Sequence, residues 1–163
     1  MDRTEPTEDT QHGRYLTFSL GNESYGLAIS YVTEIVGTQP ITPIPESPDY
    51  MKGIINLRGK IIPVLDMRLK FKEEALAYNE RTCIVVVDIQ SAFMGLIVDQ
   101  VSEVMTIDDA DIVPPPNYKA GARNRYISGV GKVGTDVKLL LDCQMLFTHA
   151  ELENINTEKE SLA

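Results

Sequence analysis

Two stretches of the chain repeat each other, and this places the strongest constraint on its fold. Residues 25–36 align without a gap with residues 94–105, and residues 50–71 align in the same order with residues 126–147. The matched positions are mainly glycines and apolar residues, together with an acidic residue in each pair. A duplicated structural unit keeps the positions that its core and turns require. We therefore predict two similar halves that pack as one pseudo-symmetric unit.

The apolar residues follow the period of β-strands rather than that of helices. Residues 14–20 alternate between apolar and polar side chains, and residues 21–22 (Gly-Asn) are typical of a turn. Similar short segments rich in β-branched residues recur along the chain, separated by Gly, Asn, Asp and Pro. This pattern is typical of small barrels or sandwiches. We predict a mainly β fold of two pseudo-symmetric barrels of about five strands each, with short helices.

Helical signals are confined to two places. Asp66 is a capping residue for a turn that reaches Phe71, and Asp142 is one for a longer C-terminal helix through Cys143 to about Asn154. We expect the first barrel to be formed mainly by residues 14–75 and the second mainly by residues 80–150, with exchange of strands between them allowed.

Charge concentrates at the two ends. The net charge is -9, and most of it lies in residues 1–13 and 151–163, which we expect to form a flexible acidic tail and a helix end with an acidic tail. Such acidity argues against binding to nucleic acid or direct contact with an anionic membrane. The sequence holds neither an apolar run long enough to span a bilayer nor the apolar core of a signal peptide. We expect a cytoplasmic protein with reduced cysteines.

The residues do not predict an enzyme. His12 and His149 lack the spacing of a zinc site or a catalytic pair, and Cys83 and Cys143 lie in apolar runs typical of packing residues. Residues 129–134 contain three glycines but fit a hairpin better than a phosphate-binding loop, because the residue after Lys132 is not Ser or Thr. We expect no catalytic residue, metal or cofactor.

Two rival functions remain open at this point. A small hydrolase would use Asp66, Asp88 or Asp99, although the sequence offers no obvious His, Cys or Lys partner for them. A structural protein that only associates with itself is the second rival. A clustered active site would favour the first, and self-association without any other partner would favour the second.

Residues 56–59 (Asn-Leu-Arg-Gly) lie between two apolar segments and predict a hairpin tip, with Gly59 supplying a positive φ. Arg58 at such a rigid tip can donate two hydrogen bonds either to Glu34 or to a partner protein, and both interpretations remain open. Glycines within strands indicate either bulges or flat, exposed places where another backbone approaches, at Gly26, Gly53, Gly95 and Gly129.

From about Arg14 to Phe147 the chain resembles the CheW family, the adaptor proteins of bacterial chemotaxis. The most specific stretch is residues 53–68 (GIINLRGKIIPVLDMR), in which NLRG is followed by IIPVLD. Further matching pieces occur in the family's order at residues 25–29, 32–35, 41–45, 95–99, 112–116 and 126–130. The resemblance implies two five-stranded SH3-like barrels, with residues 14–150 forming the CheW-like domain.

The resemblance also implies a function and a set of partners. It implies a non-catalytic adaptor that links the cytoplasmic tips of methyl-accepting chemoreceptors to the regulatory domain of the histidine kinase CheA, recruited to receptor arrays at the membrane. Glu34 and Arg58 match the family's charged pair. Other positions match residues that lie on or support partner-binding surfaces in the family, namely Val32, Gly53, Gly95, Val101 and Gly129.

Overall fold

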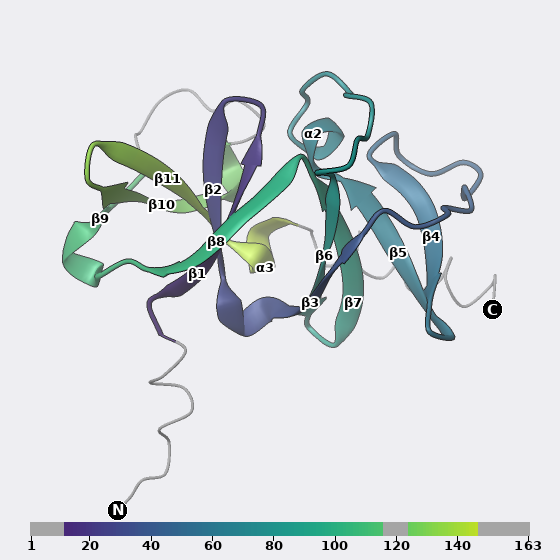
Figure 1. Cartoon of the computed structure of the whole chain (residues 1–163), viewed down its shortest axis with the longest axis horizontal. Helices are drawn as coiled ribbons and strands as arrows, with labels where there is room; N and C mark the ends of the chain where they lie inside the picture. Colours follow the sequence, from purple (N-terminus) through teal and green to yellow (C-terminus); the bar gives the residue numbers. More distant parts are fainter. Residues whose placement is uncertain (1–11, 116–123, 147–163) are drawn as a thin grey trace, which may run out of the picture.

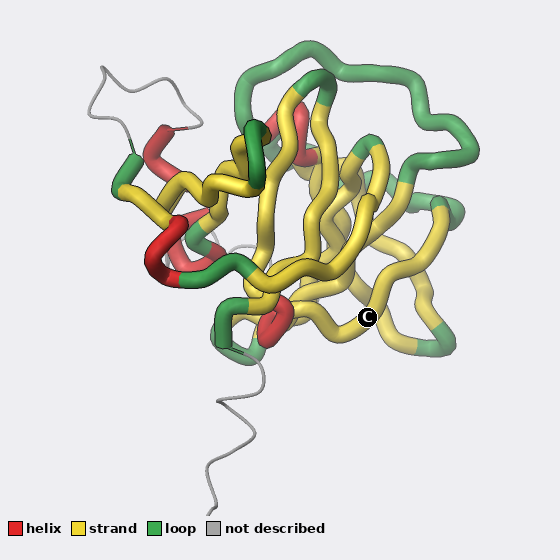
Figure 2. Tube along the Cα trace, turned by 60° about the vertical axis from the view of Figure 1, so that its left-hand side comes forward, coloured by secondary structure: helices red, strands yellow, loops and turns green. Residues whose placement is uncertain are grey.

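The structure, a computed structural model, describes residues 12–115 and 124–146 as short strands joined by hairpin turns and by longer loops (Figures 1 and 2). The strands are β1 (Arg14–Leu20), β2 (Glu23–Ala28), β3 (Val32–Gly37), β4 (Met51–Leu57), β5 (Lys60–Asp66), β6 (Cys83–Ile89), β7 (Ala92–Val98), β8 (Gln100–Thr106), β9 (Ile112–Val113), β10 (Ile127–Val133) and β11 (Asp136–Leu141). The described residues also form two single-turn helices, α2 (Met67–Lys70) and α3 (Cys143–Leu146), and three 3-10 turns, η1 (Ile29–Tyr31), η2 (Asp109–Asp111) and η3 (Asn124–Tyr126).

The strands form two curved sheets. Barrel A has the strand order β8-β1-β2-β11-β10-β9, and barrel B has the order β3-β6-β7-β5-β4. Figure 1 shows them side by side, with α3 between them. The mainly β prediction is confirmed. The sixth strand of barrel A, β9, has only two residues, and its counterpart in barrel B is an isolated bridge between Thr42 and Ile54.

Each barrel takes strands from both halves of the chain, so the sheets do not divide at residues 75–80. Barrel A combines β1 and β2 with β8, β10 and β11, whereas barrel B combines β6 and β7 with β3, β4 and β5. The exchange is completed by two parallel pairings, of β2 with β11 and of β5 with β7. Parallel neighbours require long crossovers. The crossover from β2 to β11 passes through all of barrel B, whereas the one from β5 to β7 stays within barrel B. Neither half can therefore complete a barrel alone.

The duplication extends to irregular details. When each strand is replaced by its repeat partner, the order β8-β1-β2-β11-β10 becomes β3-β6-β7-β5-β4. β-Bulges fall at equivalent residues in the two copies. Thr33 is the extra residue of β3 where it pairs with β6, and Ser102 is the extra residue of β8 where it pairs with β1. Lys52 and Ser128 are the extra residues in a second pair of equivalent strands. The predicted pseudo-symmetry is therefore confirmed down to single residues, since bulges are specific local features.

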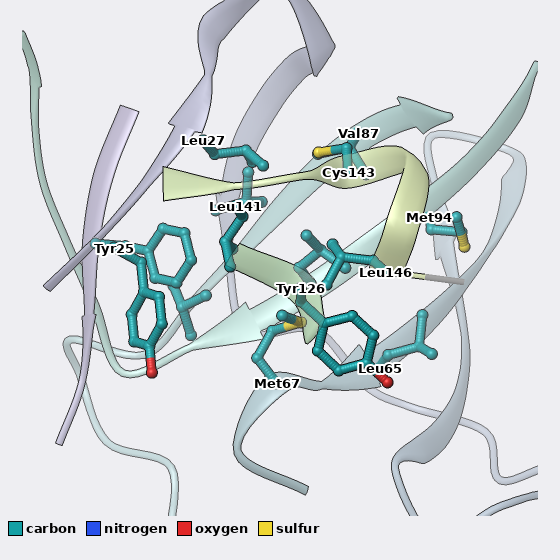
Figure 3. Close-up of a cluster of buried hydrophobic side chains, with 14 of the residues drawn as sticks. Tyr25, Leu27, Leu65, Met67, Val87, Met94, Tyr126, Leu141, Cys143 and Leu146 are labelled. Carbon is teal, nitrogen blue, oxygen red and sulfur yellow. The ribbon is translucent and has the colours of Figure 1, made fainter. Parts of the chain in front are cut away.

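The main core lies between the barrels rather than within one of them. Along β6, Val85 and Val87 contribute to this shared cluster, whereas Ile84 and Val86 contribute to a second cluster inside barrel B. Figure 3 shows side chains from both barrels, such as Leu141 and Met94, in the shared cluster. Full burial of an aliphatic side chain contributes about 1.5–3 kcal/mol. The shared cluster thus makes the two barrels a single cooperative unit.

The strand glycines are buried, which corrects the interpretation that they form flat exposed places. A Cβ added to Gly53 would lie 2.1 Å from the carbonyl oxygen of Thr42, and one added to Gly95 would lie 2.6 Å from Cγ2 of Ile84. The equivalent glycines of the other copy are crowded in the same way, at Gly26 and Gly129. Close packing of neighbouring chain explains all four glycines, and Gly53 and Gly129 lie beside bulges as the sequence suggested.

The predicted capping residues begin both helices. Asp66 accepts hydrogen bonds from the backbone N–H groups of Arg68 and Leu69 at 2.9 and 3.3 Å, and α2 ends at its C-cap Phe71. Asp142 accepts the N–H of Gln144 at 3.0 Å. The remainder of the predicted C-terminal helix, from residue 147 to about Asn154, lies outside the described residues.

An ion pair between Arg68 and Asp99 ties the barrels together at one end. The Arg68 guanidinium donates to both carboxylate oxygens of Asp99, at 2.9 Å from Nε and 2.6 Å from Nη2. Asp99, which follows β7, also accepts the N–H of Gly21 in the β1–β2 turn at 2.7 Å. Burial of the carboxylate acts to raise its pKa, but the hydrogen bonds from Arg68 and Gly21 and the charge of Arg68 outweigh it and hold the pKa of Asp99 below its usual value.

This lowered pKa predicts acid sensitivity. Because the pKa of Asp99 is lower in the folded than in the unfolded chain, the pair stabilises the fold fully above the unfolded value, about 4, and is lost as the pH falls through the folded value. We expect Asp99→Asn to reduce the free energy of unfolding by about 1–3 kcal/mol at pH 7 and to make its decline below about pH 4 shallower. Urea titrations at several pH values measure both quantities. Parallel pH profiles for the two proteins would contradict this role.

Gly53 is expected to be essential for folding. A Cβ at this position meets a backbone carbonyl, and its φ of +145° is rarely adopted by other residues. We therefore expect Gly53→Ala to lower the free energy of unfolding by about 3 kcal/mol or more. Gly37→Ala is the matched control, because nothing lies within 4 Å of the added Cβ, and its effect should stay within about 0.5 kcal/mol. Thermal melts compare the two, and equal melting temperatures would disprove the packing explanation.

Candidate partner-binding surface

The β4–β5 hairpin presents Arg58 at its tip. Leu57 pairs with Lys60, so Arg58 and Gly59 form a two-residue turn, with φ values of 53° and 89°. Two successive positive φ values are typical of a type I′ turn, and the side chain of Asn56 supports this turn by accepting the N–H of Gly59 at 2.7 Å. The sequence predicted a positive φ for Gly59 but not for Arg58. The equivalent residue of the other copy is Gly134, with a φ of +62°.

Arg58 pairs with Glu34, as one of the two sequence interpretations proposed. Its Nη2 atom donates to both carboxylate oxygens of Glu34, at 2.7 and 2.6 Å. The hydrogen bond from Glu34 and its charge raise the pKa of Arg58. The Arg58 side chain is nevertheless 67% exposed. Exposed ion pairs contribute little to stability because water and salt screen them.

The requirements of the fold therefore do not account for an arginine at this position. The left-handed backbone favours glycine, and the equivalent tip in barrel A has glycine. Glu103, the equivalent of Glu34, is present without an arginine at the equivalent tip. Because the other copy folds without this pair, the fold leaves the Arg58 guanidinium available for recognition.

Arg58 and Glu34 border a hollow of about 230 Å³ at the end of barrel B, which we call the B mouth. It is lined by Thr33, Glu34, Leu57, Arg58, Lys60, Ile62, Val86 and Phe93. The Lys60 ammonium lies 4.3 Å from the centre of the Phe93 ring, a cation–π contact. The B mouth thus combines basic groups, an aromatic ring and an apolar lining. Planar recognition by arginine together with a desolvated ring is typical of protein interfaces.

The sequence analysis did not identify Lys60 and Phe93 as residues that line this hollow. They come from different hairpins, β4–β5 and β6–β7, which meet only because β5 and β7 pair in parallel. No local motif marks this meeting. The internal repeat could have predicted that these two hairpins meet, but only if the exchange of strands between the barrels were already known.

Val32 and Val101 are equivalent residues near the starts of the edge strands β3 and β8. Both are half-buried and pack against the shared core. Three residues further along, Ile35 and Val104 are 42% and 41% exposed. Each edge strand therefore presents an apolar surface that continues outward from the shared core. Gly53, Gly95 and Gly129 are buried, so any effect of these glycines on partners acts through the fold.

Two of the three carboxylates of the hydrolase hypothesis, Asp66 and Asp99, are occupied in structural contacts. Asp66 is buried and accepts the Tyr78 hydroxyl as well as the N–H groups of α2, Asp99 pairs with Arg68, and Asp88 is exposed on β6. The cavity beside Asp66 and Asp99 has a volume of about 20 Å³, room for roughly one water molecule. This arrangement leaves no space for a substrate between the acids.

The reactive side chains of Cys143 and His12, in the described part of the chain, have structural or surface surroundings. Burial, with a contribution from Asp142, raises the pKa of the Cys143 thiol to about 12. His12 lies 3.3 Å from Asp109 at the surface, and His149 lies outside the described residues. Within residues 12–115 and 124–146, no group of three or more His, Cys, Asp or Glu could hold a metal ion. Over the same residues, no helix has the length and apolarity to cross a membrane.

Comparison with known proteins gives a consistent result. The family model of the CheW-like domain matches residues 14–151. Chemotaxis protein CheW of Klebsiella aerogenes is 34% identical over 153 residues, covering 94% of this chain and 92% of the relative. Chemotaxis protein CheW of Treponema pallidum is 35% identical over 144 residues, covering 86% of this chain and 85% of the relative.

A solved structure is similar in fold as well as in sequence. The crystal structure of scaffolding protein TtCheW from Thermoanaerobacter tengcongensis matches with a TM-score of 0.77 and 38% identity, covering 83% of this chain and 92% of that chain. The duplicated β architecture, the NLRG hairpin tip and the family match over most of the sequence agree. This chain belongs to the CheW family of chemotaxis coupling proteins.

Proposed function

We propose that this chain is a non-catalytic adaptor that links the cytoplasmic tips of methyl-accepting chemoreceptors to the regulatory domain of the histidine kinase CheA. Membership of the CheW family supports this proposal, as does the use of the description "scaffolding protein" for a similar solved structure. The proposed place of action is the receptor array, where the adaptor holds two proteins in a fixed relation. Such coupling requires that the adaptor make different contacts with the active and inactive states of its partners. An adaptor that bound both states with equal affinity would not shift the equilibrium between them.

The observation that carries the proposal is Arg58 at the B mouth. Its backbone conformation favours glycine, its ion pair is exposed, and the other copy of the fold has Gly134 in its place. A partner carboxylate or backbone carbonyl is a suitable acceptor for the guanidinium N–H groups that Glu34 leaves available. Lys60 and Phe93 extend the same surface. We propose that this mouth contacts the kinase.

The apolar edge strands support a separate place for the receptor. Val32 and Val101 lie where the shared core reaches the surface, and Ile35 and Val104 continue the apolar surface outward. An amphipathic helix can bury its apolar face against such a surface. We propose that the helical tip of a receptor binds along these strands.

Replacement of Arg58 by glycine separates recognition from folding. We expect Arg58→Gly to fold with an unchanged or raised melting temperature, because glycine suits the left-handed turn and the lost pair is exposed. We expect its affinity for the isolated regulatory domain of the kinase to fall at least about tenfold, as at an interface hot spot. Thermal melts and calorimetric titrations measure the two effects. A lower melting temperature with unchanged affinity would show that the pair serves only the fold.

Gln90→Gly is the matched control. Gln90 occupies the first turn position of the β6–β7 hairpin in the same barrel, with a φ of 52°, close to that of Arg58. This variant should gain stability in the same way and retain affinity for the kinase domain. Light scattering of the unmodified protein alone addresses the rival of pure self-association. Oligomers that form without binding either partner would favour that rival.

A further inference from the structure

The end of barrel A has a hollow that partly overlaps the position equivalent to the B mouth, sharing three lining positions with it. This hollow, which we call the A mouth, has a volume of about 510 Å³, within the range of small-ligand pockets. It lies between the starts of β2 and β11 and is lined by Asn22, Glu23, Ser24, Thr135, Asp136, Val137, Lys138 and Leu139. In the repeat, Ser24, Asp136 and Lys138 are equivalent to Phe93, Lys60 and Ile62, which all line the B mouth.

The comparison shows what the A mouth lacks. In the B mouth the chain's own Phe93 lies beneath the ammonium of Lys60 at 4.3 Å. In the A mouth the aromatic position holds Ser24, a much smaller residue, and the cation is supplied by Lys138 instead. Nζ of Lys138 lies 3.0 Å from Oγ of Ser24, so the cation lies beside the position that the ring occupies in barrel B.

We propose that the A mouth binds an uncharged aromatic side chain, phenylalanine or tyrosine, from a partner protein, with its ring against the Lys138 ammonium. The occupant is inferred from the chain itself, because the other copy fills the equivalent place with an aromatic ring under a cation. Cation–π attraction and removal of the ring from water would both stabilise the complex. Exposed Val137 at the rim extends the apolar contact.

The surrounding groups restrict the chemistry of the occupant. Glu23 and Asp136 line the hollow, so an anionic ligand would meet repulsion as well as attraction. The paired residues of β2 and β11 are Tyr25 with Leu139 and Gly26 with Leu140, and the hollow begins where this pairing ends. An extended segment of a partner can place an aromatic side chain in the hollow, beyond the last paired residues of the two strands.

The test uses the full chain and two small probes that differ only in the side chain. N-acetyl-phenylalaninamide and N-acetyl-leucinamide are titrated separately into isotope-labelled protein, and amide chemical shifts are followed by NMR. We expect saturable shifts at residues 22–24 and 135–139, with the phenylalanine probe binding about two- to fivefold more tightly than the leucine probe. Equal affinities, or shifts of the phenylalanine probe confined to other residues, would overturn the proposal.

Two variants make the test specific. Ser24→Phe copies the arrangement of barrel B, so it should fill the hollow, abolish probe binding and raise the melting temperature. Lys138→Ile copies Ile62 and removes the cation, so it should abolish the preference for the phenylalanine probe even if Ser24→Phe fails to fold. A preference that persists in Lys138→Ile would refute the cation–π contact. Arg58→Gly should bind the probes normally, which separates this site from the B mouth.

Discussion

The apolar cluster shared by the two barrels is the interaction on which the rest of this fold depends. Strands β6 and β7 are buried on both faces, because one face contributes to the shared cluster and the other to the interior of barrel B. Because each barrel takes strands from both halves of the chain, the residues of this cluster come together only when both barrels are formed. The outer ends of the barrels do not take part in the shared cluster, and the A mouth and the B mouth both lie at these ends. Binding surfaces can therefore change without cost to the shared core.

The duplication supplies an internal comparison that few single sequences offer. Features present in both copies, such as the equivalent bulges, the crowded glycines and the capping residues Asp66 and Asp142, reflect what the barrel needs. Features present in only one copy are not needed by the barrel. Arg58 against Gly134, and Phe93 against Ser24, are of this second kind. The same logic separates structural from recognition residues in other duplicated folds, because the two copies share one architecture but not one surface.

Local signals predicted the local structure of this chain well. Alternating residues located the strands, Asp66 marked the start of a helix, and residues 56–59 marked a hairpin tip. The sequence did not predict the positive φ of Arg58, because nothing in the residue type indicates it. It also missed the Arg68–Asp99 pair and the Lys60–Phe93 contact. These contacts join separate hairpins, so they depend on the strand exchange, which sequence periodicity does not encode.

The exchange also imposes an order of events on synthesis of the chain. Every strand of barrel B lies between residues 32 and 98, whereas barrel A needs its first strand, β1, and its last, β11. Domains form as their segments leave the ribosome, and contacts between distant residues form slowly. Barrel B can thus pair its strands while translation continues, although the shared core is completed only when the strands of barrel A join it. The β1–β2 hairpin, whose Phe18 is fully buried in the finished fold, lacks its partners β8 and β11 until the later part of the chain has been made.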